Sequence, residues 1–382
     1  MPKVAPAGSV LRGDVAVPDE VDARLSTTLE RLVARPDIHH ALFAVASGDG
    51  SQRWSAAAGP AGPDSFPLRP DTPFFIASIT KRFIATLILQ ASERGELDLD
   101  DPIVRHLPAE LTGGLHVHQG VDCTAAITVR HLLSHTSGLP DYWERPRSGA
   151  SLFDDLAAGR DRSWGLHDVV RMARADHTPH FPPQNLAARR QRARYSDTGF
   201  QLLIAIAERV TGRPFGALLD ERILAPLGLE RTWLPAHGEP PPGAPPPACI
   251  YAKTRPLELP GMITSSNDLV STAADLLRFQ RALLASELFA RPATGRLLTE
   301  RANLLGNMVP IRYGLGTMIF RVGRLNGPGR RKVTLIGHSG VTGTWLFHCP
   351  ELDVDLAGTI DAATGKRLPF RLMARLLRAW HE

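Results

Sequence analysis

A serine followed three residues later by a lysine, where an extended segment turns into an apolar helical run, constrains this chain most. The tetrapeptide Ser78-Ile79-Thr80-Lys81 lies between the extended residues 72–77 and the apolar residues 82–89. A spacing of three places the hydroxyl and the amine on one helical face. The free N–H groups at the start of a helix favour a developing oxyanion, and a partly desolvated lysine can lose its proton near neutral pH and serve as a base. The pattern therefore suggests a nucleophilic serine; the alternative is a serine N-cap followed by a surface lysine.

The composition limits the classes of function. The chain has 382 residues, of which 43% are hydrophobic, so it can bury a sizeable core and form two structural lobes. Its net charge of +5 comes from arginine, since lysine occurs only at Lys3, Lys81, Lys253, Lys332 and Lys366. An arginine-rich, lysine-poor balance is typical of a high-GC genome, and no nucleic-acid-binding motif accompanies it. We expect no nucleic-acid partner.

The cysteines and the N-terminus bear on the cellular location of the protein. Cys123, Cys249 and Cys349 are far apart and odd in number, which predicts neither a disulfide framework nor a cysteine metal site. Residues 1–8 lack the apolar core of a secretion signal, and no apolar run approaches the length of a membrane span. We expect a cytoplasmic protein without a membrane partner, unless a leader has been removed.

Apolar periodicity predicts strands at both ends of the chain and helices between them. The N-terminal part contains a helix and a β-hairpin, at residues 19–34, 41–46 and 52–58, before the helix that begins at Ser78. The middle is mostly helical with long loops, its helices at residues 128–134, 167–175, 198–210 and 272–284, and its proline-rich loop at 235–247. The last part has four strands and a closing helix, at residues 315–322, 333–337, 343–348, 352–360 and 366–380.

This order predicts an α+β fold in which the N- and C-terminal segments share one antiparallel sheet flanked by helices. A mostly helical lobe is then inserted between the two halves of the sheet. We expect residues 1–100 and 305–382 to form the sheet lobe, residues 101–304 to form the helical lobe, and the active site to lie in the cleft between the lobes.

A second candidate stretch, Tyr195-Ser196-Asp197, opens the helix that continues at Thr198. A tyrosine placed just before a helix can point its phenol into a cleft, where a neighbouring ammonium would lower its pKa. It could then move a proton between a serine and a leaving group. The structural alternative is that Asp197 is only the N-cap of the helix.

A third stretch, Gly337-His338-Ser339-Gly340-Val341, ends one predicted strand. A glycine-rich strand edge allows a substrate to approach the backbone, whose N–H groups can bind an oxyanion. The stretch also nearly matches the G-x-S-x-G nucleophile elbow. Val341 replaces its last glycine, however, and no alternation of strands and helices surrounds it, so we do not favour that interpretation.

Taken in this order, the three stretches resemble the serine β-lactamase and penicillin-binding-protein superfamily. The resemblance is greatest to the branch of class C β-lactamases, D-Ala-D-Ala carboxypeptidases and related esterases and transacylases. It extends over about residues 20–380. Further stretches similar to signatures of this branch are His131-Leu132-Leu133-Ser134-His135-Thr136-Ser137-Gly138-Leu139-Pro140, Leu269-Val270-Ser271-Thr272-Ala273-Ala274-Asp275-Leu276 and Tyr313-Gly314-Leu315-Gly316.

The resemblance implies a role for each matching residue. Ser78 would be the acylated nucleophile, Lys81 its activating partner, and Tyr195 the general base or proton shuttle. The backbone N–H groups of Ser78 and Val341 would form the oxyanion hole. The remaining matches, Asp197, His338, Ser339 and Gly340, would bind substrate. No metal or organic cofactor is implied.

Two positions depart from the family pattern. Asp197 replaces the usual Asn, and an ionised carboxylate cannot donate a hydrogen bond to a substrate amide. His338 replaces a lysine, and a neutral imidazole attracts a β-lactam carboxylate poorly. Both departures favour esterase, D-peptidase or acyl-transfer chemistry over β-lactam hydrolysis.

We interpret the other histidines and the basic run first as structural features. His131 and His135 lack the glutamate of an H-E-x-x-H zinc site, and we expect them to be core or loop residues. We expect His116 and His118 to be solvated. The basic run at residues 189–194 is either a solvated loop or a rim that attracts an acidic substrate or an acyl-carrier protein.

Three functions remain open on the sequence. The first is hydrolysis of an ester or amide, on a small-molecule or peptide-like acyl substrate, through a Ser78 acyl-enzyme. The second is a biosynthetic transacylase or thioesterase of the same fold. The third is a catalytically silent binding protein, against which the intact Ser78, Lys81 and Tyr195 set argues.

Overall fold

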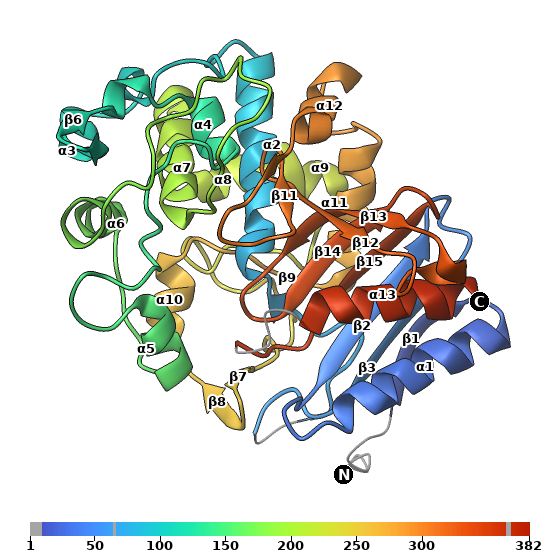
Figure 1. The fold of residues 1–382 in the computed structure, drawn as a ribbon. Coiled ribbons are helices and arrows are strands. Elements are labelled where there is room, and N and C mark those ends of the chain that lie inside the picture. The colour runs from blue at the N-terminus through green and yellow to red at the C-terminus, as the bar shows by residue number, and fades with distance from the viewer. Residues whose placement is uncertain (1–9, 64–65, 364–367) are drawn as a thin grey trace.

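The two ends of the chain build one antiparallel sheet (Figure 1), as the strand pattern predicts. The computed structural model describes residues 10–63, 66–363 and 368–382. Within these residues the sheet has nine strands, in the spatial order β1 (Val10–Ala16), β3 (Arg53–Ala58), β2 (Ala41–Ser47), β15 (Val354–Thr359), β14 (Thr344–Cys349), β13 (Val333–Ser339), β12 (Met318–Val322), β11 (Arg312–Tyr313) and β10 (Asn303–Leu304).

The N-terminal hairpin joins the C-terminal strands at the pairing of β2 with β15. Leu42 lies opposite Thr359 and Ser47 opposite Val354, so the pairing extends along the whole of β15. Every residue of β15 and the first five of β2 are buried, because helices cover both faces of the sheet here. The predicted α+β class, with one sheet made from both ends, is confirmed.

Strand β1 was not expected from the sequence. It pairs with β3 at the edge of the sheet, with a register shift between Arg12 and Val15. Most of its residues are exposed or half-buried, and it lacks the continuous apolar run by which β2 could be recognised. An edge strand of this kind leaves little periodic signal.

Helices lie on both faces of the sheet. On one face α1 (Asp19–Val33) and α13 (Leu368–His381) run side by side, and Phe370 of α13 packs against Phe320 and Phe347 of the sheet (Figure 1). On the other face α11 (Ala273–Leu284) packs against β2, β14 and β15. The predicted helix at residues 366–380 begins in the structure at Leu368, and its first two residues lie outside the described residues.

The segment between the two halves of the sheet is mostly helical, as predicted. The central helices α2 (Thr80–Glu93) and α7 (Asp197–Thr211) pack against each other. Around them and at the edge of the sheet lie α3 (Ala109–Thr112), α4 (Val129–Leu133), α5 (Leu152–Ala158), α6 (Leu166–Arg171), α8 (Phe215–Leu219), α9 (Ala225–Leu227), α10 (Pro260–Ser265) and α12 (Pro292–Glu300). Short ladders join β4 (Phe74–Phe75) to β9 (Val270–Ser271), β5 (Val117–His118) to β6 (Val121–Asp122), and β7 (Ile250–Ala252) to β8 (Arg255–Leu257).

The division into lobes at residues 100 and 305 stays a prediction. Helix α11 falls in the range assigned to the helical lobe but packs on the sheet. Helix α2 falls in the range assigned to the sheet lobe but packs on α7.

Two of the histidine predictions can be compared with the fold. His131 is buried and caps its own helix, because its Nδ1 accepts a hydrogen bond from the Thr128 N–H and its Nε2 donates to the Gln184 carbonyl. The expectation that His116 is solvated is wrong. His116 is fully buried and its Nε2 donates to the Phe181 carbonyl, because the loop at residues 177–184 covers it.

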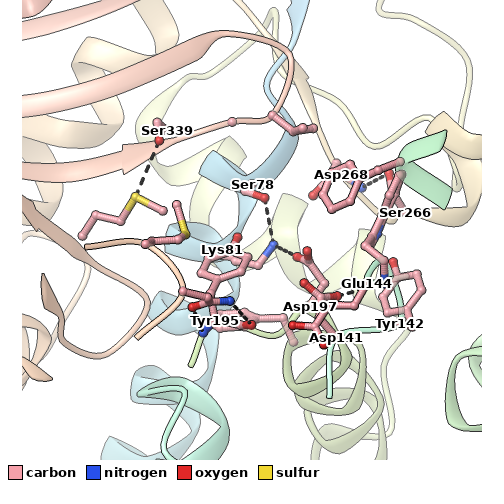
Figure 2. Close-up of a pocket in the computed structure, with 18 of the residues that line it drawn as sticks. Ser78, Lys81, Asp141, Tyr142, Glu144, Tyr195, Asp197, Ser266, Asp268 and Ser339 are labelled. Atoms are coloured by element: carbon pink, nitrogen blue, oxygen red, sulfur yellow. Dashed lines mark hydrogen bonds and ion pairs between the residues drawn. The ribbon is translucent and has the colours of Figure 1, made fainter. Parts of the chain in front are cut away.

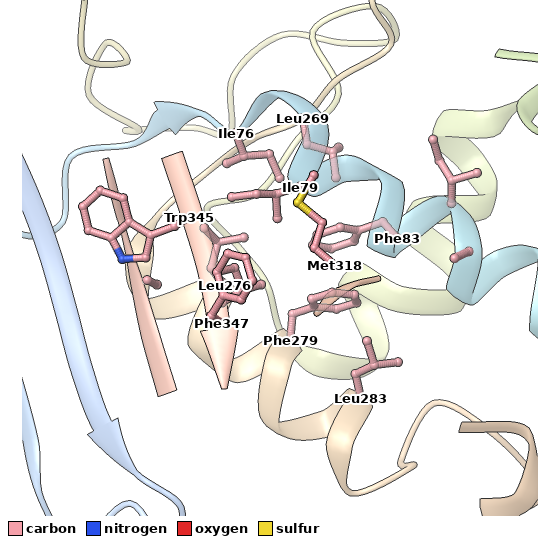
Figure 3. Packing of buried hydrophobic residues seen from close by; sticks show 14 of the residues in the cluster. Ile76, Ile79, Phe83, Leu269, Leu276, Phe279, Leu283, Met318, Trp345 and Phe347 are labelled. Carbon is pink, nitrogen blue, oxygen red and sulfur yellow. The ribbon is translucent and has the colours of Figure 1, made fainter. Parts of the chain in front are cut away.

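An aromatic stack joins helix α2 to α11, which packs on the sheet. The rings of Phe83 in α2 and Phe279 in α11 are parallel, with centroids 3.8 Å apart (Figure 3). Both rings are fully buried, and Ile79, Leu276 and Met318 lie around them. This contact positions the first turn of α2 against the sheet.

We expect Phe83→Ala to lower the free energy of unfolding by about 3–5 kcal/mol, because it leaves a cavity in this stack. Phe66→Ala is the matched control, since the Phe66 side chain is 45% exposed, and it should change the stability by less than about 0.5 kcal/mol. Denaturant unfolding of both variants measures the difference. Equal effects would show that the stack does not support α2.

In the part of the chain that the structure describes, none of the helices is long and apolar enough to cross a membrane.

Candidate active site

Ser78 lies in a short 3-10 turn, η1 (Ala77–Ile79), between β4 and α2. The pairing of β4 with β9 and the hydrogen bond from the Ile76 N–H to the Leu269 carbonyl hold the chain in place before the turn. Ala77 has a φ of +47°, in a region that residues other than glycine seldom adopt. The strained turn brings Ser78 onto the wall of a cavity of about 360 Å³.

Lys81 is buried beside Ser78. Its Nζ donates a hydrogen bond to Ser78 Oγ at 3.1 Å and forms an ion pair with Asp197 (Figure 2). Only 4% of the residue is exposed, and the rings of Tyr195 and Phe200 lie 5.3 and 5.4 Å from Nζ. The alternative of a serine cap and a surface lysine is excluded.

The expectation that Lys81 has a lowered pKa is wrong. Burial is the largest single effect and disfavours the ammonium, but Asp197 and Asp268 together outweigh it and raise the pKa of Lys81 above its usual range. Lys81 is therefore an ammonium in the free protein at neutral pH. The sequence shows the lysine but not the two carboxylates that surround it.

Tyr195 lies directly before α7, with its phenol against Ser78. Its backbone is clamped by Asn307, whose Oδ1 accepts from the Tyr195 N–H at 3.0 Å and whose Nδ2 donates to the Tyr195 carbonyl at 3.3 Å. Burial and the Asp197 carboxylate raise the pKa of Tyr195 well above its usual range, although a hydrogen bond with Ser78 opposes this shift. The expectation of a lowered pKa for Tyr195 is therefore wrong as well.

The N-cap of α7 is Ser196, and Asp197 is the first residue of the helix rather than its cap. The Asp197 side chain is thus free of a capping role. It forms the ion pair with Lys81 instead.

Ser78 and Val341 line the cavity from two distant parts of the chain. Among the described residues, neither the Ser78 N–H nor the Val341 N–H donates a hydrogen bond. A Cβ atom on Gly340 would lie 2.8 Å from the Ala77 Cβ and 2.9 Å from the Ile76 carbonyl oxygen. Glycine at this position therefore lets the end of β13 approach η1.

His338 lies behind the cavity wall rather than on it. It is fully buried, its Nδ1 donates to the Ser339 carbonyl, and its Nε2 accepts from the Tyr313 hydroxyl, both at 2.9 Å. Burial and the nearby Lys81 lower the pKa of His338 well below its usual range, so the imidazole is neutral. The prediction that His338 binds substrate directly is not supported by this position, whereas Ser339, Gly340 and Asp197 all line the cavity.

The cavity is lined by aromatic and apolar residues and also by acidic ones. Its apolar residues include Tyr142, Trp143, Phe153, Met308, Met318 and Phe370. Its acidic residues are Asp141, Glu144, Asp197 and Asp268. Asp141 and Glu144 were not singled out on the sequence, although Asp141 directly follows the signature that ends at Pro140; Asp268 and Asn307 were also missed.

The basic run at residues 189–194 does not form a positive rim on the cavity. Only Arg194 lines it, and its guanidinium is paired with Glu144 Oε1 through Nε at 3.0 Å and Nη2 at 2.6 Å. Arg192 packs over the Phe181 ring at 4.6 Å. The charge nearest the cavity is therefore already neutralised.

Within the described residues, no cluster of three or more His, Cys, Asp or Glu side chains has a geometry that could hold a metal ion. The three cysteines are free, as their spacing predicts.

Comparison with known proteins places this geometry among serine hydrolases. The model of the beta-lactamase family matches residues 26–375. Esterase EstB of Burkholderia gladioli is 34% identical over 193 residues, which are 46% of this chain and 45% of EstB. The matched region spans about half the length of the first curated relatives, which include the putative penicillin-binding protein PbpX of Bacillus subtilis.

The solved structures similar to this chain match nearly all of it. A D-stereospecific amidohydrolase from Streptomyces sp. is 29% identical, covers 90% of this chain and 94% of its own, and has a TM-score of 0.70. D-amino acid amidase from Ochrobactrum anthropi SV3 covers 94% of this chain and 98% of its own with a TM-score of 0.72; its identity of 24% shows a shared fold.

Proposed function

The chain belongs to the beta-lactamase family, and we propose that it is a serine hydrolase that cleaves a small ester or amide through an acyl-enzyme on Ser78. One observation carries the proposal. Ser78 Oγ lies 3.1 Å from Lys81 Nζ on the wall of a cavity that Val341 also lines. We also propose that the chain falls in the class C-like branch.

The proposed reaction has two steps. Ser78 Oγ attacks the carbonyl carbon, its proton passes to Lys81 or through Tyr195, and the N–H groups of Ser78 and Val341 hold the oxyanion. The leaving alcohol or amine takes up that proton as its bond to the carbonyl breaks. A water molecule then attacks the carbonyl carbon of the acyl-enzyme and gives up a proton, the bond to Ser78 Oγ breaks as that oxygen is protonated, and the carboxylic acid leaves.

Activity should rise with pH, since Lys81 can accept a proton only after it has lost its own. Its pKa is raised by Asp197, so neutral Lys81 becomes common only in the alkaline range. In Asp197→Asn this ion pair is lost and the pKa of Lys81 falls. We expect the rising limb of kcat/KM against pH, for a neutral ester, to move to lower pH in this variant.

Asp268→Asn is a second variant, for which we expect a smaller shift of the same limb. Asp268 raises the pKa of Lys81 less than Asp197 does, so its removal should shift the limb in the same direction by a smaller amount. An unchanged or upward shift in Asp197→Asn would mean that Lys81 is not the group whose deprotonation activates Ser78.

A panel of three substrates best distinguishes the possible substrate classes. EstB is named an esterase, and the amidohydrolase from Streptomyces is described as D-stereospecific. We propose that activated esters and D-amino acid amides are cleaved and that a chromogenic cephalosporin is cleaved slowly or not at all, because Asp197 is paired with Lys81 and His338 is neutral and buried. Steady-state rates on the three substrates test this. A cephalosporin as the best substrate would contradict it.

Transfer of the acyl group to another acceptor, with an acyl-carrier protein as a further partner, is the alternative that the basic run suggested. The exposed Arg190 and the stacked Arg192 are its remaining basis. Arg190→Glu with Arg192→Glu should then raise KM for an acyl-carrier substrate and spare a small neutral ester. Equal effects on both substrates would exclude such a rim.

A further inference from the structure

Asp141 is a buried carboxylate that the proposed reaction does not use. It lies in the loop after α4 and lines the cavity (Figure 2), yet only 5% of the residue is exposed. Its Oδ1 accepts a hydrogen bond from the Trp143 N–H at 3.1 Å. Among the described residues, Oδ2 has no hydrogen-bond partner. A carboxylate with one unpaired oxygen facing a cavity costs free energy unless a ligand donates a hydrogen bond to that oxygen.

The carboxyl groups around Asp141 outnumber the cations near them. Asp141, Asp197 and Asp268 all lie close enough to Lys81 to interact with its ammonium, so three carboxylates share one positive charge. Glu144 also acts on Asp141, and its own carboxylate is paired with the Arg194 guanidinium. Burial raises the pKa of Asp141 well above its usual range and that of Asp268 to about 6, so an ammonium bound beside Asp141 would favour its ionised form.

Aromatic rings stand next to this carboxylate. Tyr142 and Trp143 follow Asp141 in the chain and line the same cavity, together with Phe153. The Trp143 ring packs against those of Phe153 and Trp164 at 5.1 and 5.6 Å, which holds the wall rigid. An acidic group beside the faces of aromatic rings is the chemistry that binds an organic ammonium.

We propose that Asp141 binds a primary ammonium on the acyl part of the substrate, so that the substrate is an amino acid ester or amide with a free amine. The ammonium donates to the open Oδ2 and supplies the missing positive charge, while Tyr142 and Trp143 pack on its carbon skeleton. This inference rests on the proposed function, since it assigns the substrate of the same site. It runs opposite to the acidic substrate that the basic run suggested.

The first test compares two esters that differ in one group. D-phenylalanine methyl ester carries the ammonium, and the methyl ester of D-phenyllactic acid has a hydroxyl of similar size in its place; the L-enantiomers are measured in parallel. After correction for their rates of alkaline hydrolysis, the amine ester should have the higher kcat/KM by about tenfold or more in one enantiomeric series. An equal or lower value for the amine ester in both series would overturn the proposal.

The second test removes the charge of Asp141 and keeps its turn. In Asp141→Asn the side-chain oxygen can still accept from the Trp143 N–H, so the loop should persist. The ratio of kcat/KM for the amine ester to that for the hydroxy ester should then fall to nearly one. Equal losses on both esters would indicate a structural role for Asp141 and would overturn the proposal.

A binding measurement separates this inference from the proposed function. The Ser78→Ala protein, which cannot form an acyl-enzyme, should bind D- or L-phenylalaninamide in calorimetry about tenfold more tightly than phenyllactamide of the same configuration. Labelling of the unmodified protein at Ser78 by a fluorophosphonate, without this preference, would leave the hydrolase assignment intact and overturn the ammonium site. Absence of both labelling and turnover would overturn the two together.

Discussion

Ser78→Ala should reduce ester hydrolysis by about 10⁴–10⁶-fold, to a rate near that of the uncatalysed reaction. The hydroxyl is the group that becomes acylated, and among the described residues that line the cavity no other hydroxyl has a lysine in hydrogen-bond contact. Because the side chain is small and lies on the cavity wall, alanine leaves the turn and its strained Ala77 in place. The loss should therefore appear in kcat without a loss of stability.

Ser339→Ala is the matched control for this loss. Ser339 lines the same cavity and lies in the near-match to a nucleophile elbow, but its Oγ donates only to the Met318 sulfur at 3.6 Å. We expect a loss of less than about tenfold, since no base is available to activate this serine. A loss as large as that of Ser78→Ala, with Ser78→Ala retaining activity, would reverse the assignment.

Lys81→Met should lower kcat/KM by about 10²–10⁴-fold, because it removes the group that accepts the serine proton. The change should also destabilise the fold. It removes the cation that pairs with Asp197 and so leaves a partly buried carboxylate without its partner. Both effects are measured on the same protein, by ester hydrolysis and by thermal unfolding.

The double variant Lys81→Met with Asp197→Asn separates these two effects. Removing the carboxylate along with the amine should restore most of the lost stability, while activity stays low. Recovery of activity in the double variant would mean that the charge balance, and not the amine, is what the reaction needs.

The elements that could be predicted from the sequence are those with local or strongly periodic signals. The buried strand β2 shows as a continuous apolar run. Helix α7 shows as an amphipathic helix closed by Gly212, and α11 as one opened by Thr272. The proximity of Ser78 to Lys81 follows from helical spacing. The proximity of Tyr195, more than a hundred residues later, could only be expected from the resemblance to a known family.

What could not be predicted depends on contacts between distant segments. The direction of the Lys81 pKa shift is set by Asp197 and Asp268, which reach it from two other parts of the chain. His338 is buried and hydrogen-bonded to the Tyr313 hydroxyl, a partner from another strand that its own sequence motif does not reveal. Asp141 carries no motif of its own, and only its burial in the cavity wall draws attention to it.

Intact-mass spectrometry after incubation with a fluorophosphonate, followed by peptide mapping, tests the central claim most directly. We predict the addition of one phosphonyl group per chain, located on the peptide that contains Ser78, and no addition to the Ser78→Ala protein. An adduct on Ser339 or elsewhere, or the same addition to Ser78→Ala, would contradict the assignment of Ser78 as the nucleophile.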